Sequence, residues 1–259
     1  MLIDTHCHLD YPDFDRDRAH VIARAVEAGV TEMISIGTRI ETSAGAIKVA
    51  RSFPNVWATV GIHPLEVADA PDNALEQLRK LAMNERVVAI GEIGLDYYEI
   101  DQINTRVIKR RQADLFRSQL ELAADLGLSV VFHQREAWED FLRMIEPFTG
   151  LVHGVFHCFK GTPAQVNQVS ALGHLVSFTG MATFPEMPQI AATAATIDSG
   201  LFMVETDSPF HSPAPDRKNR CEPAFARQIA EQIAKLRDVS LDFLAAQTSA
   251  TARTFFKLK

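Results

Sequence analysis

The stretch RQADLFRSQLELAADLGLSVVFHQ, residues 111–134, decides the fold because it contains one complete passage from helix to strand. Apolar residues recur at helical spacing over 111–126, and Gly127 suits a left-handed helix C-cap. A short β-rich run then covers 129–132 and ends at His133. When such a unit is repeated along a chain, it predicts parallel strands joined by crossover helices.

The same unit recurs from one end of the chain to the other. Eight β-rich runs begin near Leu2-Ile3 and continue at Glu32–Ile36, Val56–Val60, Val87–Ile90, Ser129–Phe132, Leu151–Phe156, His174–Phe178 and Leu201–Val204. Helical spacing also appears in Ala19–Ala28, Leu75–Met83 and Phe225–Leu236. Eight parallel strands can close into a barrel, and about 250 residues is typical of that fold. We therefore expect an α/β fold, a (β/α)8 TIM barrel forming a single domain over residues 1–259.

Composition narrows the class of protein. With 47% hydrophobic and 23% charged residues, the chain can bury a large core. A net charge of −7 argues against broad electrostatic binding of nucleic acid, although a nuclease whose metals meet a phosphate locally stays possible. Three widely spaced cysteines favour reduced thiols. With no signal segment and no long apolar run, we expect a cytoplasmic protein that does not enter a membrane.

Polar side chains follow the predicted strands at their carboxyl ends, where the active sites of barrels lie. These residues come from five strands that are far apart in the sequence. They are His6, His8, Glu92, His133, His157 and Asp207. The alternative, a set of unrelated structural polar residues, explains a single histidine well but not six residues in phase with the strands. We predict a metal centre.

The two histidines of the first strand are two positions apart, so both rings point to the same side and can bind one ion. Two divalent ions about 3.5 to 4 Å apart can share a carboxylate and activate a water molecule. We assign that bridging role to Glu92, because a lone buried glutamate would be costly without cations. His133 and His157 would bind the second ion, and imidazole suits Zn, Mn, Co or Ni.

Asp207 is expected to bind the first ion and to accept the proton of the attacking water. Its alternative role is an Asx cap at the start of a loop. Glu205 lies two residues earlier and either orients a histidine ligand or is a structural acceptor. The Pro-rich segment 208–223 that follows is predicted to be a long functional loop.

Three further residues near the barrel mouth are expected to contact substrate. His63 follows the third strand, and substrate contact is preferred to metal binding for it. Arg135 and Lys160 lie shortly after two proposed ligands and are placed to hold phosphate oxygens. The alternative for both cations is an ordinary solvated charge. Cys7 should turn away from the centre and form a buried, inert thiol.

The motifs together resemble the TatD family of metal-dependent hydrolases, which belongs to the amidohydrolase-like barrels, over nearly the whole chain. The matching segments are Ile3–Asp10, Gly61–Pro64, Gly91–Tyr98, His133–Ala137, His157–Phe159 and Glu205–Pro209. The resemblance implies a metal-dependent DNase, commonly a 3′ to 5′ exonuclease that uses Mg or another divalent ion. The chain departs from the family pattern at Leu65, where a second histidine is frequent, at Lys160–Thr162 and at Cys221.

The leading hypothesis is thus a two-metal phosphodiesterase acting on DNA, either single-stranded DNA or 3′ ends, with Mg, Mn, Zn or Ni as the ions. The second is hydrolysis of another ester or amide, such as D-aminoacyl-tRNA deacylation or small phosphodiesters. The third is a non-catalytic metal-binding barrel, which the complete set of six ligands disfavours. The sequence leaves the oligomeric state open.

Overall fold

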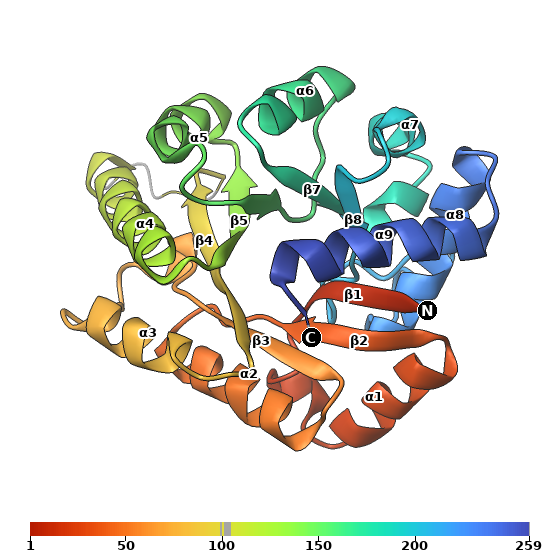
Figure 1. The fold of residues 1–259 in the computed structure, drawn as a ribbon, viewed down its shortest axis with the longest axis horizontal. Helices are drawn as coiled ribbons and strands as arrows, with labels where there is room; N and C mark the ends of the chain where they lie inside the picture. Colours follow the sequence, from red (N-terminus) through yellow and green to blue (C-terminus); the bar gives the residue numbers. More distant parts are fainter. Residues whose placement is uncertain (99, 101–104, 259) are drawn as a thin grey trace.

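One parallel sheet of eight strands runs through the protein in the order β1 to β8, with helices packed around it (Figure 1). The computed structural model describes residues 1–98, 100 and 105–258. The strands are β1 (Leu2–Cys7), β2 (Val30–Ser35), β3 (Val56–Val60), β4 (Val87–Asp96), β5 (Ser129–Arg135), β6 (Gly154–Phe156), β7 (Leu175–Phe178) and β8 (Phe202–Val204). The expected α/β barrel with one domain is confirmed.

Helices alternate with the strands, as the repeated unit predicts. The α-helices are α1 (Arg18–Glu27), α2 (Ile40–Ser52), α3 (Ala74–Ala82), α4 (Thr105–Leu126), α5 (Trp138–Ile145), α6 (Pro163–Ala171), α7 (Pro188–Thr196), α8 (Ala226–Leu236) and α9 (Leu241–Phe256). Short 3-10 helices are η1 (Pro12–Phe14), η2 (Pro64–Glu66), η3 (Glu146–Phe148), η4 (Gly180–Thr183) and η5 (Pro223–Phe225). Within the described ranges, no helix is long and apolar enough to cross a bilayer.

The barrel closes where β1 meets the segment that follows β8. Cys7 and Ser208 form an isolated parallel bridge, and the Asp207 amide donates to the His6 carbonyl over 2.8 Å. Deeper in the barrel, the buried Asp4 carboxylate accepts hydrogen bonds from the Thr206 amide and hydroxyl at 2.9 and 2.6 Å. Burial raises the pKa of Asp4 to about 8. These contacts tie the first strand to the last, so residues 200 positions apart become neighbours.

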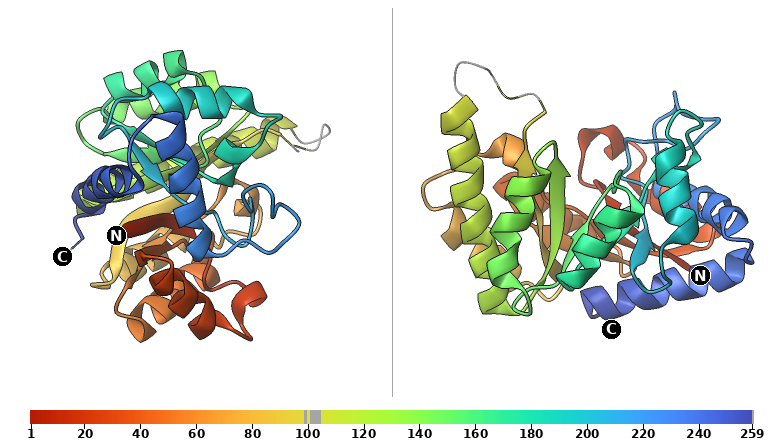
Figure 2. Two further views of the ribbon diagram at one scale, coloured as in Figure 1. Left: turned by 90° about the vertical axis from the view of Figure 1, so that its right-hand side faces the viewer. Right: turned by 90° about the horizontal axis from the view of Figure 1, so that it is seen from above.

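The inside of the barrel is a packed apolar core. Ile3, Ile34, Val131 and Met203, from four different strands, belong to one buried cluster with Phe255 of α9. In the right-hand view of Figure 2, α9 lies across the end of the barrel from which the strands start. This end is therefore closed by side chains, and the opposite end carries the loops.

The strand boundaries differ from the sequence prediction mainly at β4, which continues past Ile90 to Asp96. Its second half pairs with β5 from Ile93 opposite Phe132 to Asp96 opposite Arg135. The apolar run breaks at Gly91 and Glu92, which is why the sequence predicts a strand that ends at Ile90. A Cβ at Gly94 would overlap the carbonyl oxygen of His133, so glycine is needed for this close approach.

The start of β6 was also predicted wrongly. The strand begins at Gly154, so His153 lies before it and is exposed. The preceding residues belong instead to a turn after η3, in which the Leu151 and Val152 amides donate to the Phe148 carbonyl.

Candidate metal centre

The six predicted metal ligands converge at the carboxyl ends of the strands. His6 lies in β1 and His8 just beyond it, Glu92 lies within β4, and His133 lies in β5. The other two, His157 and Asp207, follow β6 and β8. Their side chains are all largely buried, with His133 the most accessible at 16%. The barrel therefore gathers, from five strands, the residues that the sequence singled out.

Glu92 lies at the middle of the cluster, and its two oxygens face different partners. Its Oε1 is 2.7 Å from His133 Nδ1 and 2.8 Å from His157 Nε2. Its Oε2 lies on the other side, 3.5 Å from His6 Nε2. A carboxylate in this position can bridge two cations, one on each side.

The histidine nitrogens are paired around this carboxylate. His6 Nε2 and His8 Nε2 are 3.3 Å apart, and His133 Nδ1 and His157 Nε2 are also 3.3 Å apart. Converging imidazole nitrogens beside a buried carboxylate are a suitable donor set for a divalent transition ion. The groups His6–His8–Glu92 and His63–Glu92–His133 each bring their ligand atoms within 4.8 Å of one another. The residues thus fit a metal on either side of Glu92.

Asp207 belongs to the side that holds the β1 histidines. Its Oδ1 lies 3.3 Å from His8 Nε2 and 3.5 Å from His6 Nε2. The residue has a left-handed backbone with φ of 57°, and its amide donates a hydrogen bond to the His6 carbonyl. Aspartate is among the few non-glycine residues that tolerate this conformation, which is found at turns and at functional sites.

The electrostatics of the cluster favour bound positive charge. Burial opposes ionisation of Glu92, yet His157 and His63 hold the pKa of its carboxyl well below the usual value. Burial likewise opposes protonation of His157, but Glu92 and Glu205 raise its pKa well above that of free histidine. The pKa of Asp207 is lowered because hydrogen bonding to His8 and the nearby histidine charges outweigh burial. Ionised carboxylates in such a buried place require cations.

Sequence reasoning missed Asp96, which orients a proposed ligand. Its Oδ2 is 2.9 Å from His133 Nε2, and its Oδ1 accepts a hydrogen bond from the Tyr98 amide at 3.0 Å. A carboxylate behind a ligand histidine fixes the ring and its tautomer. The available signal was the spacing between Glu92 and Asp96, which places them on the same face of one strand if the strand continues.

Glu205 is a buried acceptor behind His157. Its Oε1 accepts a hydrogen bond of 2.6 Å from the Cys158 amide and lies 3.6 Å from His157 Nδ1. Its Oε2 accepts from the Ser177 hydroxyl at 2.6 Å. The buried carboxylate therefore fixes the turn that carries His157.

His63 lies at the edge of the centre in a defined tautomer. Its Nδ1 accepts a hydrogen bond from the Leu65 amide at 3.1 Å, so the neutral ring carries its proton on Nε2. Burial and the neighbouring His133 lower the pKa of His63, which favours the neutral form. The Nε2 lies 3.5 Å from Glu92 Oε1.

A cleft of about 540 Å³ opens beside the cluster, and both predicted cations line it. The Arg135 guanidinium stacks on the half-exposed ring of Tyr98, 3.5 Å from its centroid. Lys160 is exposed on the opposite loop, and Trp138 contributes a further aromatic face. The cleft thus combines positive charge and aromatic surface with direct access to His157 and Asp207.

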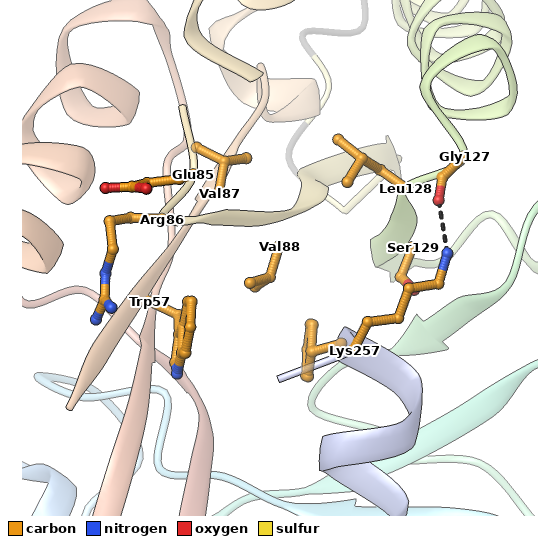
Figure 3. A pocket seen from close by; sticks show the side chains of 10 residues that line it. Trp57, Glu85, Arg86, Val87, Val88, Gly127, Leu128, Ser129 and Lys257 are labelled. Carbon is orange, nitrogen blue, oxygen red and sulfur yellow. Dashed lines mark hydrogen bonds between the residues drawn. The ribbon is translucent and has the colours of Figure 1, made fainter. Parts of the chain in front are cut away.

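A second pocket of about 380 Å³, shown in Figure 3, lies at the other end of the barrel. There the Arg86 guanidinium stacks on Trp57 and donates to the carbonyls of Pro54 and Val56. Lys257 donates to the Gly127 carbonyl at 2.9 Å. Both of its cations are thus engaged in contacts with backbone carbonyls, and the described residues that line it include no histidine.

A (β/α)8 barrel with a histidine and carboxylate cluster at its mouth defines a metal-dependent hydrolase. Comparisons with known proteins agree and are more specific: residues 3–257 match the model of the TatD related DNase family. The chain belongs to that family, as its motifs indicated, and is a metal-dependent hydrolase.

Full-length relatives are similar throughout. The chain is 32% identical over 259 residues to an uncharacterized metal-dependent hydrolase, YabD of Bacillus subtilis, covering 100% of both proteins. It is 35% identical over 266 residues to the 3′-5′ ssDNA/RNA exonuclease TatD of Erwinia tasmaniensis, covering 99% of this chain and 100% of that protein. The crystal structure of YjjV, a TatD homolog from Escherichia coli, superposes with a TM-score of 0.92 at 28% identity, over 100% of this chain and 98% of the other.

Proposed function

We propose that the protein is a 3′ to 5′ exonuclease that shortens single-stranded nucleic acid, with two divalent ions in its centre. The observation that carries this proposal is the position of Glu92, with one oxygen toward His6 and the other toward His133 and His157. We assign His6, His8 and Asp207 to one ion and His133 and His157 to the other. When bound, the two ions would polarise the phosphodiester and lower the pKa of the attacking water.

The side chains around the centre would then divide the remaining tasks. Asp207 is ionised at neutral pH, as a group that accepts a proton from water must be. His63, neutral with its proton on Nε2, would donate a hydrogen bond to a phosphate oxygen or to the leaving oxygen. Buried surroundings strengthen these interactions because little water competes.

The cleft supports a single strand as substrate. Aromatic faces with adjacent cations bind unpaired bases and the backbone without depending on sequence, and stacking contributes about 1 to 3 kcal/mol per base. Tyr98 and Trp138 offer such faces, while Arg135 and Lys160 would hold phosphates. Because the chain as a whole carries a net charge of −7, the phosphates would be attracted by these two cations and not by the protein surface in general. The relatives named ssDNA/RNA exonucleases support the same substrate class.

We also propose a cytoplasmic location, which the three free cysteines support.

The test is a gel assay of metal-reconstituted protein with 5′-labelled single-stranded DNA or RNA and Mg or Mn. We expect a descending ladder of products from the native protein and none from Asp207→Asn. A substrate with a blocked 3′ end should resist cleavage if the polarity is correct. Intact nucleic acid beside turnover of a D-aminoacyl-tRNA or a small phosphodiester would overturn the exonuclease assignment in favour of another ester.

Arg135→Ala tests the cleft separately from the centre. We expect KM for a single strand to rise about tenfold, because one phosphate contact and its stacking on Tyr98 are lost, while hydrolysis of a small chromogenic phosphodiester stays the same. Arg143→Ala, a solvent-exposed arginine of α5, is the matched control. Equal loss on both substrates would show that Arg135 does not hold the strand.

A further inference from the structure

A second cluster of metal-ligating side chains lies in the wall of the cleft. Cys158 follows β6, while Asp207 and His211 belong to the loop after β8, and all three line the cleft. One ligand atom from each lies within 4.8 Å of the other two. His211 Nε2 is 3.4 Å from Asp207 Oδ2. The two histidine pairs around Glu92 do not use either Cys158 or His211.

The backbone holds the thiol in place. Cys158 has a left-handed φ of 47°, and its amide donates to Glu205 Oε1 at 2.6 Å. Its Sγ lies 3.6 Å from Thr179 Oγ1 and 3.9 Å from Met181 Sδ, which are both neutral. The thiol thus lies among soft, uncharged neighbours on one side and faces His211 and Asp207 on the other.

Asp207 can serve this cluster and the first ion together. Its Oδ1 faces His6 and His8, whereas its Oδ2 faces His211. A sulfur, an imidazole nitrogen and a carboxylate oxygen are three ligands of a tetrahedral zinc site, with the fourth position open to water. A thiolate ligand disfavours Mg, which prefers oxygen.

We propose that Cys158, His211 and Asp207 form a third cation site that takes zinc or a similar soft divalent ion. The site differs from the two positions around Glu92 in containing sulfur. On binding, the Cys158 S–H bond breaks, its proton goes to solvent, and the sulfur lone pair forms the bond to the ion with no change of oxidation state. Because Asp207 is shared, occupancy of this site would couple to the first ion.

Cobalt titration of the metal-free protein tests the proposal without any substrate. A thiolate bound to Co²⁺ gives a charge-transfer absorption in the near ultraviolet that histidine and carboxylate ligands do not give. We expect this band in the native protein and its loss in Cys158→Ser. The matched control is Cys221→Ser, since Cys221 is a buried thiol that does not line the cleft, and this variant should keep the band. Equilibrium dialysis with zinc should give one bound ion fewer for Cys158→Ser than for the native protein.

A second variant keeps the test decisive if Cys158→Ser does not fold. His211→Gln removes a ligand from the loop after β8. The affinity for Co²⁺, read from the absorption band, should fall at least tenfold. A native protein without the band, or a band that survives in both variants, would overturn the third site. Neither result depends on nuclease activity, so failure here is distinct from failure of the exonuclease assignment.

Discussion

The two ends of the barrel use buried residues in opposite ways. At the amino ends of the strands, Phe255 of α9 packs with Val131 and Met203 in an apolar cluster. At the carboxyl ends, the buried residues include Glu92 and Asp207, whose ionised forms burial disfavours. The apolar end therefore stabilises the fold. The other end lowers stability, because its buried carboxylates are costly unless positive charge lies beside them.

The largest expected effect is at the charged end. Glu92→Gln should lower kcat about 10³-fold, because the carboxylate between the two histidine pairs is replaced by an uncharged amide. Metal content, measured by elemental analysis after dialysis, should fall together with activity, while the metal-free variant stays folded. Glu85→Gln, an exposed acid at the opposite end, is the matched control. Full metal content in Glu92→Gln would contradict the bridging assignment.

Substitutions at the closed end should change the free energy of unfolding but not the catalytic activity. Phe255→Ala is expected to lower the free energy of unfolding by about 3 kcal/mol, because it leaves a cavity beneath the barrel core. The change is measured by urea denaturation, with Phe243→Ala, half-exposed on the same helix, changing it by about 0.5 kcal/mol or less. Activity per folded molecule should not change. A large loss of metal in Phe255→Ala would mean that the two ends are not independent.

A histidine at the closed end should make the protein sensitive to acid. Burial, with a contribution from His153, lowers the pKa of His174 from 6.5 to about 4, and its Nδ1 accepts from the Gly154 amide. The folded state therefore binds the proton less well than the unfolded state. Stability is full above about pH 6.5 and falls as pH drops toward about 4, by up to about 3 kcal/mol.

His174→Asn tests this dependence, because an amide oxygen can accept the same hydrogen bond but does not titrate. Urea denaturation at several pH values should give a flatter acid limb for this variant than for the native protein. His20→Asn, on the exposed face of α1, should keep the native slope. If both variants lose stability in acid as the native protein does, His174 is not responsible.

The smallest expected effect is a loss of metal affinity on replacing Asp96 at the charged end. Asp96→Asn leaves an oxygen for the Tyr98 amide but removes the charge behind His133, so metal affinity should fall about 10- to 100-fold. Competition with a fluorescent chelator measures it directly, and Asp125→Asn, exposed on α4, serves as the control. An affinity within about twofold of native would leave Asp96 with only a structural role.

The sequence by itself determined the architecture and most of the proposed centre. Repeated passages such as 111–134 fix parallel strands, because helical and strand periodicities are local properties of the chain. His133 and His157 could be selected because each follows an apolar run, and His6 and His8 because they form a pair two residues apart at the end of the first strand. The carboxyl ends of parallel strands must meet at one mouth.

Only the tertiary structure decided the contacts that depend on distances between elements. The sequence does not single out Asp96, because the apolar run ends before Gly91 and Glu92 and the second half of β4 exists only through its pairing with β5. The approach of His211 to Asp207 and Cys158 follows from the path of a long loop. Such approaches have no local pattern, since they arise from packing between segments that the sequence places far apart.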